Sequence, residues 1–195
     1  MVPSSTPPDL VEAKRRLRLE MRRRREALAE AGAGARAAAI LLETFLRPGD
    51  VVAVFWSIGD ELDTAPLRAG LIERGHDIAL PVVVGRGQPL ALRAWRPGDA
   101  MASGPFGIQE PLAAAPALQP TLIVVPFLAV NRRGYRLGYG GGYYDRTIAG
   151  LPAARTVGWG YAGQVIDRLP TGPNDQAVDA VVTEAGWFVT EERES

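Results

Sequence analysis

Two apolar runs constrain the fold of this chain more than any other feature of its sequence. Residues 51–56 read VVAVFW and residues 121–130 read TLIVVPFLAV. Runs of this length, rich in β-branched residues and without polar alternation, are typical of strands that are covered on both faces. Helix-like segments separate the two runs, so the sequence predicts an α/β fold with a mostly parallel sheet and helices on both faces.

The other elements follow from helical spacing, short apolar runs and Gly or Pro breakers. Helices are expected near residues 9–30, 35–46, 64–75 and 142–150. Further strands are expected near residues 78–84, 90–95, 155–161 and 179–184, with a loop over 96–111. The 195 residues suit one domain over 9–190, with loose tails at 1–8 and 191–195.

Composition excludes several classes of protein. There is no cysteine, which rules out disulfide scaffolds, cysteine nucleophiles and thiolate zinc sites. His76 is the single histidine, so a Ser-His-Asp triad or a histidine-rich metal site has little support. The 22 basic residues balance 22 acidic ones, which opposes a dedicated nucleic-acid binder. No apolar stretch approaches the roughly 20 residues of a membrane span, and no signal peptide is visible, so we expect a cytoplasmic protein without membrane partners. No exposed apolar helix or edge is obvious in the sequence, so we also expect a monomer.

The most informative segment is RLGYGGGYYDR at residues 136–146. Its glycines allow positive φ angles and close approach of the backbone to a ligand, and N–H groups ahead of a helix form a concave phosphate site. Arg136 is placed to clamp a phosphate, and Asp145, in the first helical turn, to hold Mg²⁺. The alternative is a flexible glycine turn with a capping aspartate, against which the adjacent Tyr143 and Tyr144 favour an aromatic-walled site.

The N-terminal helix carries a dense run of basic residues. By helical projection, a stripe that must pack on the domain is formed by Leu10, Leu17, Met21 and Leu28. Lys14, the only lysine, flanks this stripe with Arg18 and Arg25, where cationic heads can meet a bound polyphosphate. A solvated face is expected for Arg15, Arg16, Arg22, Arg23 and Arg24. The alternative function, a nucleic-acid-binding module, is opposed by the zero net charge and by the packed stripe.

Two more places carry candidate ligand-binding residues. Trp56 ends the first apolar run and offers a flat apolar face, and Glu61 can accept hydrogen bonds from N–H donors of a ligand. A core tryptophan and a surface glutamate are the alternative. Asp175, in the string Pro-Asn-Asp, is either a turn residue or a second carboxylate near a metal.

Taken together, these segments resemble the 5-formyltetrahydrofolate cyclo-ligase family, also called 5,10-methenyltetrahydrofolate synthetases. The matching pieces are KRRLR (14–18), GDELDT (59–64), FGIQEP (106–111), LIVVPFLAV (122–130), RLGYGGGYYDR (136–146), and ND followed by VDAVVTE (174–184). They span almost the whole chain in the family's order. RLGYGGGYYDR is specific, whereas KRRLR alone is weak.

The resemblance implies a three-layer α/β/α sandwich with an open, mixed, Rossmann-like sheet. It implies that 5-formyltetrahydrofolate and ATP react, with Mg²⁺, to give 5,10-methenyltetrahydrofolate, ADP and phosphate, through phosphorylation of the formyl oxygen and attack by N10. The ATP-binding positions match Lys14, Arg15, Arg16, Leu17, Arg18, Arg136, Leu137, Gly138, Tyr139, Gly140, Gly141, Gly142, Tyr143 and Tyr144. The folate-binding positions match Arg18, Trp56, Glu61, Tyr139, Gly140, Gly141, Gly142 and Tyr143. The magnesium ligands match Asp145 and Asp175, and the catalytic roles fall on Lys14, Arg136, Tyr143 and Asp145.

The sequence departs from the family pattern in places. Asn131 and Thr121 stand where members often carry aspartate, and we interpret both as local changes near turns. Trp56 is bulkier than many residues at its position. The arginine-rich surface would allow a polyglutamylated folate. The alternative enzyme, another α/β enzyme that uses ATP or a sugar phosphate, would share the glycine loop and would not need Trp56 and Glu61.

Overall fold

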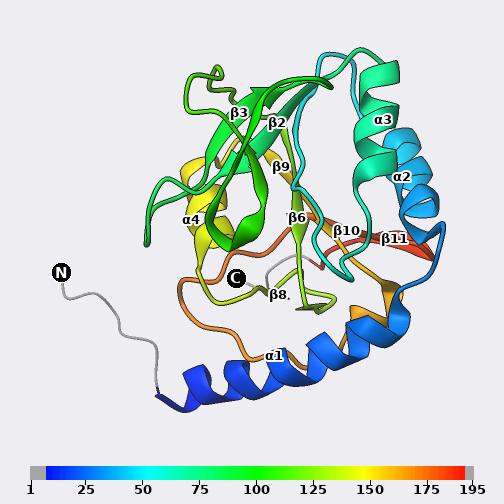
Figure 1. Cartoon of the computed structure of the whole chain (residues 1–195). Coiled ribbons are helices and arrows are strands. Elements are labelled where there is room, and N and C mark those ends of the chain that lie inside the picture. The colour runs from blue at the N-terminus through cyan, green and yellow to red at the C-terminus, as the bar shows by residue number, and fades with distance from the viewer. Residues whose placement is uncertain (1–7, 192–195) are drawn as a thin grey trace.

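The structure, a computed structural model, describes residues 8–191, so most of both predicted tails lies outside the described residues. Its centre is a sheet in the order β11-β10-β9-β6-β1-β2-β3 (Figure 1). The strands are β1 (Val51–Ala53), β2 (Asp77–Val82), β3 (Ala91–Trp95), β6 (Leu122–Pro126), β9 (Arg155–Trp159), β10 (Ala180–Thr183) and β11 (Gly186–Val189). Neighbours from β10 to β2 pair in parallel, whereas β3 and β11 are antiparallel edges. The predicted α/β fold with a mixed, mostly parallel sheet is confirmed.

Helices cover both faces of the sheet, as the two apolar runs predict. The helices α2 (Ala33–Thr44) and α3 (Ala65–Glu73) lie on one face, and α4 (Tyr143–Gly150) lies on the other (Figure 1). Successive side chains of a strand point to opposite faces. In β1, Val52 packs in the cluster under α2 and α3, and Ala53 packs in the cluster under α4. This alternation of two apolar faces explains why the central strands read as continuous apolar runs.

The first helix, α1 (Pro8–Leu28), crosses one end of the sheet (Figure 1). Leu17 and Met21, two residues of its predicted stripe, pack against Leu128 and Leu137. Leu137 belongs to a small ladder of β7 (Ala129–Val130) and β8 (Arg136–Leu137). No helix within residues 8–191 combines the length and the apolar character that a membrane crossing requires.

The predicted loop over 96–111 is wrong in part. A hairpin of β4 (Met101–Ser103) and β5 (Gln109–Pro111) interrupts it, with the 3₁₀ turn η1 (Pro105–Gly107) between the strands. Most residues of β4 are exposed, so this strand lacks the apolar pattern that marks the central strands.

Both departures from the family pattern lie at turns or strand ends. Asn131 Oδ1 accepts hydrogen bonds from the backbone N–H of Arg133 and of Tyr135, each at 3.1 Å. Thr121 Oγ1 donates to Asp50 Oδ1 at 2.6 Å, just before β6 begins. Each side chain therefore completes a local hydrogen-bond network.

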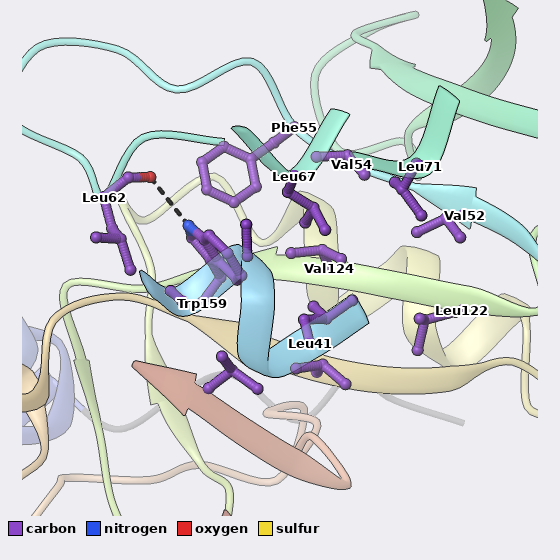
Figure 2. Packing of buried hydrophobic residues seen from close by; sticks show 14 of the residues in the cluster. Leu41, Val52, Val54, Phe55, Leu62, Leu67, Leu71, Leu122, Val124 and Trp159 are labelled. Carbon is purple, nitrogen blue, oxygen red and sulfur yellow. Dashed lines mark hydrogen bonds between the residues drawn. The ribbon is translucent and has the colours of Figure 1, made fainter. Parts of the chain in front are cut away.

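Trp159 is the largest fully buried side chain on the face under α2 and α3. Its indole Nε1 donates to the backbone oxygen of Leu62 at 3.0 Å, and Figure 2 shows this bond beside Leu41 and Val124. The bond ties the segment after β1 to the core, and that segment also carries Glu61.

We expect Trp159→Phe to lower the free energy of unfolding by about 1–3 kcal/mol, because the Leu62 oxygen then lies buried without a donor. Urea unfolding measures the change. Trp187→Phe is the matched control, since Trp187 is 49% exposed and its replacement should cost less than about 0.5 kcal/mol. Equal losses in the two variants would contradict a role for the buried bond.

Candidate active site

A cleft of about 960 Å³ lies beyond the carboxyl ends of the parallel strands. Trp56 follows β1, Val83 follows β2 and Pro126 ends β6, and all three line the cleft. Ligands of open α/β sheets gather at this end of the strands. The cleft is closed on its other sides by α1, by the loop between β8 and α4, and by residues 173–176.

The glycine loop requires conformations that other residues rarely adopt. Gly140 has φ 104° and Gly142 has φ 65°, both in the left-handed range, and Gly142 is the N-cap of α4. A Cβ on Gly141 would lie 2.6 Å from the ring of Tyr143. The loop therefore brings backbone and a helix N-terminus to the cleft, an arrangement suited to anions.

Arg136, which is buried, pairs with the half-buried Asp145 at the base of this loop. Arg136 Nη2 lies 3.2 Å from Asp145 Oδ1, and its Nη1 donates to the backbone oxygen of Gln176 at 2.5 Å. The backbone N–H of Gln176 also donates to Asp145 Oδ1, at 3.1 Å. Burial lowers the pKa of Arg136, and the neighbouring charge of Asp145 opposes that shift. The guanidinium is thus held by protein groups, and its role on a phosphate stays a prediction.

Lys14 and Asp175 form a second pair between distant parts of the chain. Lys14 Nζ lies 2.7 Å from Oδ1 and 2.5 Å from Oδ2 of Asp175. The backbone N–H of Gly172 donates to Asp175 Oδ2 at 2.7 Å. Both side chains line the cleft and are largely buried. The Asp175 carboxylate therefore accepts hydrogen bonds from a turn and from the ammonium group of Lys14.

The two predicted metal ligands fit Mg²⁺ by chemistry. Asp145 accepts from the residue next to Asp175, so the two carboxylates belong to neighbouring segments of one wall. Residues 8–191 contain no group of three or more His, Cys, Asp or Glu side chains placed to hold a metal. Mg²⁺ commonly uses one or two carboxylates and completes its shell with phosphate oxygens and waters. Two carboxylates, Asp145 and Asp175, match that pattern. In the structure described, Asp175 pairs with Lys14 and Asp145 pairs with Arg136.

Trp56 forms one wall of the cleft, and its ring contacts a cation and a second aromatic ring. The guanidinium carbon of Arg68 lies 4.1 Å from the centroid of the Trp56 ring, and Trp95 meets that ring edge-on at 5.8 Å. Arg68 is itself buried and donates to Thr64 Oγ1. The cation and the second ring hold the orientation of Trp56, which is half-buried, lines the cleft and also packs against the core cluster under α2 and α3.

Glu61 lies in a network that the sequence does not reveal. Its Oε2 accepts from the backbone N–H of Ile58 at 2.9 Å, and its Oε1 accepts from the hydroxyl of Tyr139. Arg25 donates to the same hydroxyl and lies 3.6 Å from Glu61 Oε1. Arg25 also binds Asp60 at 2.6 Å and 3.0 Å. Burial raises the pKa of Glu61, against the opposing effect of the Tyr139 hydrogen bond.

The remaining residues of α1 divide in a way that differs from the projection. Arg18 lines the cleft and donates to the backbone oxygen of Gly138 at 2.9 Å. Arg22, expected on the solvated face, also lines the cleft, with its guanidinium carbon 5.8 Å from the Tyr139 ring centroid. Arg15 and Arg16 bind Glu12 on the exposed side of the helix, outside the cleft lining.

Every other predicted site residue except Leu17 and Arg25 lies in the cleft wall. Arg25, expected to flank the stripe beside Lys14 and Arg18, is buried against Asp60 instead. The loop residues that line it are Arg136, Leu137, Gly138, Tyr139, Gly140, Gly141, Gly142, Tyr143, Tyr144 and Asp145. Leu17 packs in the apolar cluster beneath α1. His76, for which no role is expected, is half-buried with Nδ1 3.0 Å from the backbone oxygen of Asp50.

The fold and the cleft define an α/β enzyme whose site lies at the carboxyl ends of parallel strands. The sequence profile of the 5-formyltetrahydrofolate cyclo-ligase family matches residues 10–184. The chain therefore belongs to this family, and its activity is that of a 5-formyltetrahydrofolate cyclo-ligase in folate one-carbon metabolism.

Named relatives agree with the profile. The 5-formyltetrahydrofolate cyclo-ligase of Mycolicibacterium smegmatis is 35% identical over 144 residues, which are 69% of this chain and 74% of the relative. That of Escherichia coli K12 is 34% identical over 140 residues, 68% of this chain and 76% of the relative. The solution structure of Aquifex aeolicus 5,10-methenyltetrahydrofolate synthetase superposes with a TM-score of 0.79 at 29% identity, covering 93% of this chain and 95% of the other.

Proposed function

We propose that this enzyme cyclises 5-formyltetrahydrofolate to 5,10-methenyltetrahydrofolate in a reaction that needs ATP and Mg²⁺ and releases ADP and phosphate. One observation carries the proposal: a single cleft gathers the glycine loop, two carboxylates with cationic partners, and an aromatic wall. The first two suit a nucleotide polyphosphate with its cation, and the third suits a flat heterocycle.

The reaction divides into two balanced steps. A formamide oxygen is a poor leaving group, so the formyl oxygen of the substrate first takes the terminal phosphoryl group, and the bond to ADP breaks. N10 of the folate then attacks the formyl carbon. The phosphate leaves with the former formyl oxygen, N10 loses its proton, and the five-membered ring is closed. Such phosphoryl transfer asks the protein mainly for positioning and charge stabilisation, with no protein nucleophile.

The phosphate side of the cleft supplies those needs. Lys14 and Arg136 bring positive charge to the phosphates, and the glycine loop presents backbone to them. Asp145 and Asp175 would hold Mg²⁺, which would supply positive charge against the phosphate oxygens. In the structure described, the ammonium group of Lys14 is held by Asp175 at the phosphate side of the cleft. Tyr143, at the start of α4, borders the loop on the folate side.

The folate side orients the substrate. The ring of Trp56 packs on the pterin, and Glu61 accepts hydrogen bonds from the amino-bearing edge of the pterin. Arg18 and Arg22 line the same cleft, so cationic groups are available to the glutamate portion of the folate.

Near-ultraviolet absorbance of the purified protein with 5-formyltetrahydrofolate tests the proposal, because the methenyl product has a conjugated chromophore that the substrate lacks. We expect absorbance to rise only when both ATP and Mg²⁺ are present, with one ADP formed per product. A rise without ATP would overturn the nucleotide role. No rise, with ATP still binding in calorimetry, would overturn the folate assignment.

We expect Trp56→Ala to raise the KM for 5-formyltetrahydrofolate about tenfold, because the pterin loses an apolar contact surface, while the KM for ATP changes little. Steady-state kinetics with each substrate varied in turn measures the split. Trp187→Ala, on the exposed edge strand, is the control for general effects of removing a tryptophan. An equal rise in both KM values would contradict the placement of Trp56 on the folate side.

A further inference from the structure

Four carboxylates line the cleft: Glu61, Glu110, Asp145 and Asp175. Asp145 and Asp175 each pair with a cation, and Glu61 has Arg25 nearby. Glu110 has no cationic partner within residues 8–191 and accepts one hydrogen bond there, from the backbone N–H of Val83 at 3.2 Å. Neither composition nor spacing marks it as a site residue. A buried carboxylate with so few partners is costly, and such groups are concentrated at functional sites.

The β4–β5 hairpin places this carboxylate in the cleft wall. Glu110 is only 6% exposed, yet it borders the cleft. Its Oε1 accepts from Val83, and no described residue donates to Oε2. Among the described residues, Arg93 Nε is the only side-chain N or O atom that is both fully enclosed and without a hydrogen bond. Oε2 of Glu110 has no hydrogen bond either, so it is not fully enclosed and must have some exposed surface. It belongs to a side chain that borders the cleft.

The backbone of the hairpin leaves room for the carboxyl group. A Cβ on Gly104 would lie 2.2 Å from Cδ of Glu110. Gly104 has φ −82°, an angle that any residue can adopt. A glycine is therefore needed here because a side chain would collide with the carboxyl group, and not because of the backbone angle. Burial raises the pKa of Glu110, and its bond with Val83 opposes that shift. The hairpin is thus shaped around a carboxyl group with one free oxygen.

We propose that Glu110 is a substrate-binding residue whose Oε2 accepts a hydrogen bond from an N–H group of the reduced pterin ring. The inference rests on the proposed function, since it names a contact of that substrate. Asp145 and Asp175 have cationic partners on the phosphate side, whereas a carboxylate without one repels phosphate, which assigns Glu110 to the folate side of the cleft. It is also not grouped with Asp145 and Asp175 as a metal site among the described residues. Both oxygens of Glu61 already accept protein donors, so Glu110 offers the freer acceptor.

Glu110→Gln tests this contact with little change of shape. The amide oxygen can keep the Val83 bond, which turns the amide NH₂ group toward the cleft, so a donor meets the donor of the substrate. We expect the Kd for 5-formyltetrahydrofolate, measured by calorimetry without ATP, to rise about 10- to 100-fold. The KM for ATP should stay within about threefold. Glu73→Gln, the same change at an exposed position on α3, should alter neither value.

A second variant reaches the contact without touching Glu110. Alanine can adopt the backbone angle of Gly104, but its methyl group would displace the carboxyl group of Glu110. Gly104→Ala should therefore also raise the Kd for 5-formyltetrahydrofolate. It also decides the matter should Glu110→Gln fail to fold. Folate binding equal to wild type in a folded Glu110→Gln or Gly104→Ala protein overturns the inference. Wild-type protein that neither binds nor converts the folate overturns the proposed function instead.

Discussion

Asp145→Asn is expected to lower kcat by about 10³-fold, with near-wild-type folding. The substitution keeps the shape of the side chain and an oxygen that can accept from the Gln176 N–H, but it removes the negative charge that we propose binds Mg²⁺. The charge stabilisation that a bound metal supplies in phosphoryl transfer amounts to several kcal/mol, and each 1.36 kcal/mol is about a factor of ten. The methenyl absorbance assay at saturating substrates measures kcat.

Two controls separate the metal role from a structural one. Asp77→Asn makes the same change at an exposed carboxylate, which contacts Arg96 at 3.4 Å, and should leave kcat unchanged. A titration with Mg²⁺ should show a raised half-saturation concentration in Asp145→Asn. If that concentration stays at the wild-type value while kcat falls, Asp145 acts by holding Arg136 in place and not by binding the metal.

The central strands were predictable because each one buries both of its faces. Runs 51–56 and 121–130 contain β1 and β6, at the middle of the sheet. The edges were harder to predict. The apolar run of β11, Trp187 to Val189, is much shorter than those of the central strands, and Val189 is 65% exposed, so this strand is not predicted from the sequence. The antiparallel direction of β3 depends on its pairing with β2, which the sequence of β3 does not encode.

The cleft residues were predictable where a local motif carries the chemistry. The glycine loop lets the backbone approach a ligand closely, and the glycines that allow this are close together in the sequence. The contact between Lys14 and Asp175 spans 161 positions, and only the folded chain brings the two together. Helical projection gave the direction of each α1 side chain around the axis, but it could not say which loop covers which side. Arg22 was therefore assigned to solvent, although it lines the cleft.

The burial of Glu110 also could not be predicted from the sequence. It is one acidic residue in a short segment without apolar periodicity, which predicts a loop and an exposed charge. Burial comes from the packing of the hairpin on β2 and from the space at Gly104. A buried charge with a free oxygen is visible only when the hydrogen bonds of the folded chain are known.

Lys14→Met is expected to lower kcat/KM for ATP by about 10²- to 10³-fold, because the variant keeps the length of the side chain and loses the charge that we propose binds the phosphates. It also leaves the Asp175 carboxylate without its ammonium partner. Steady-state kinetics with ATP varied at saturating folate measures the effect. Binding of 5-formyltetrahydrofolate without ATP should change little, since Lys14 is assigned to the phosphate side.

Lys14→Arg distinguishes charge from shape at the same position. An arginine restores the charge, but its planar guanidinium is larger than an ammonium group and binds in a fixed fork geometry. In the narrow space where Lys14 is largely buried against Asp175, we expect Lys14→Arg to recover only part of the lost activity. Arg24→Met, on the exposed side of α1, controls for the loss of one positive charge. Full recovery of activity in Lys14→Arg would mean that only the charge at this position matters. An equal loss of activity in Arg24→Met and Lys14→Met would mean that the overall positive charge of α1, and not a contact at Lys14, draws ATP to the cleft.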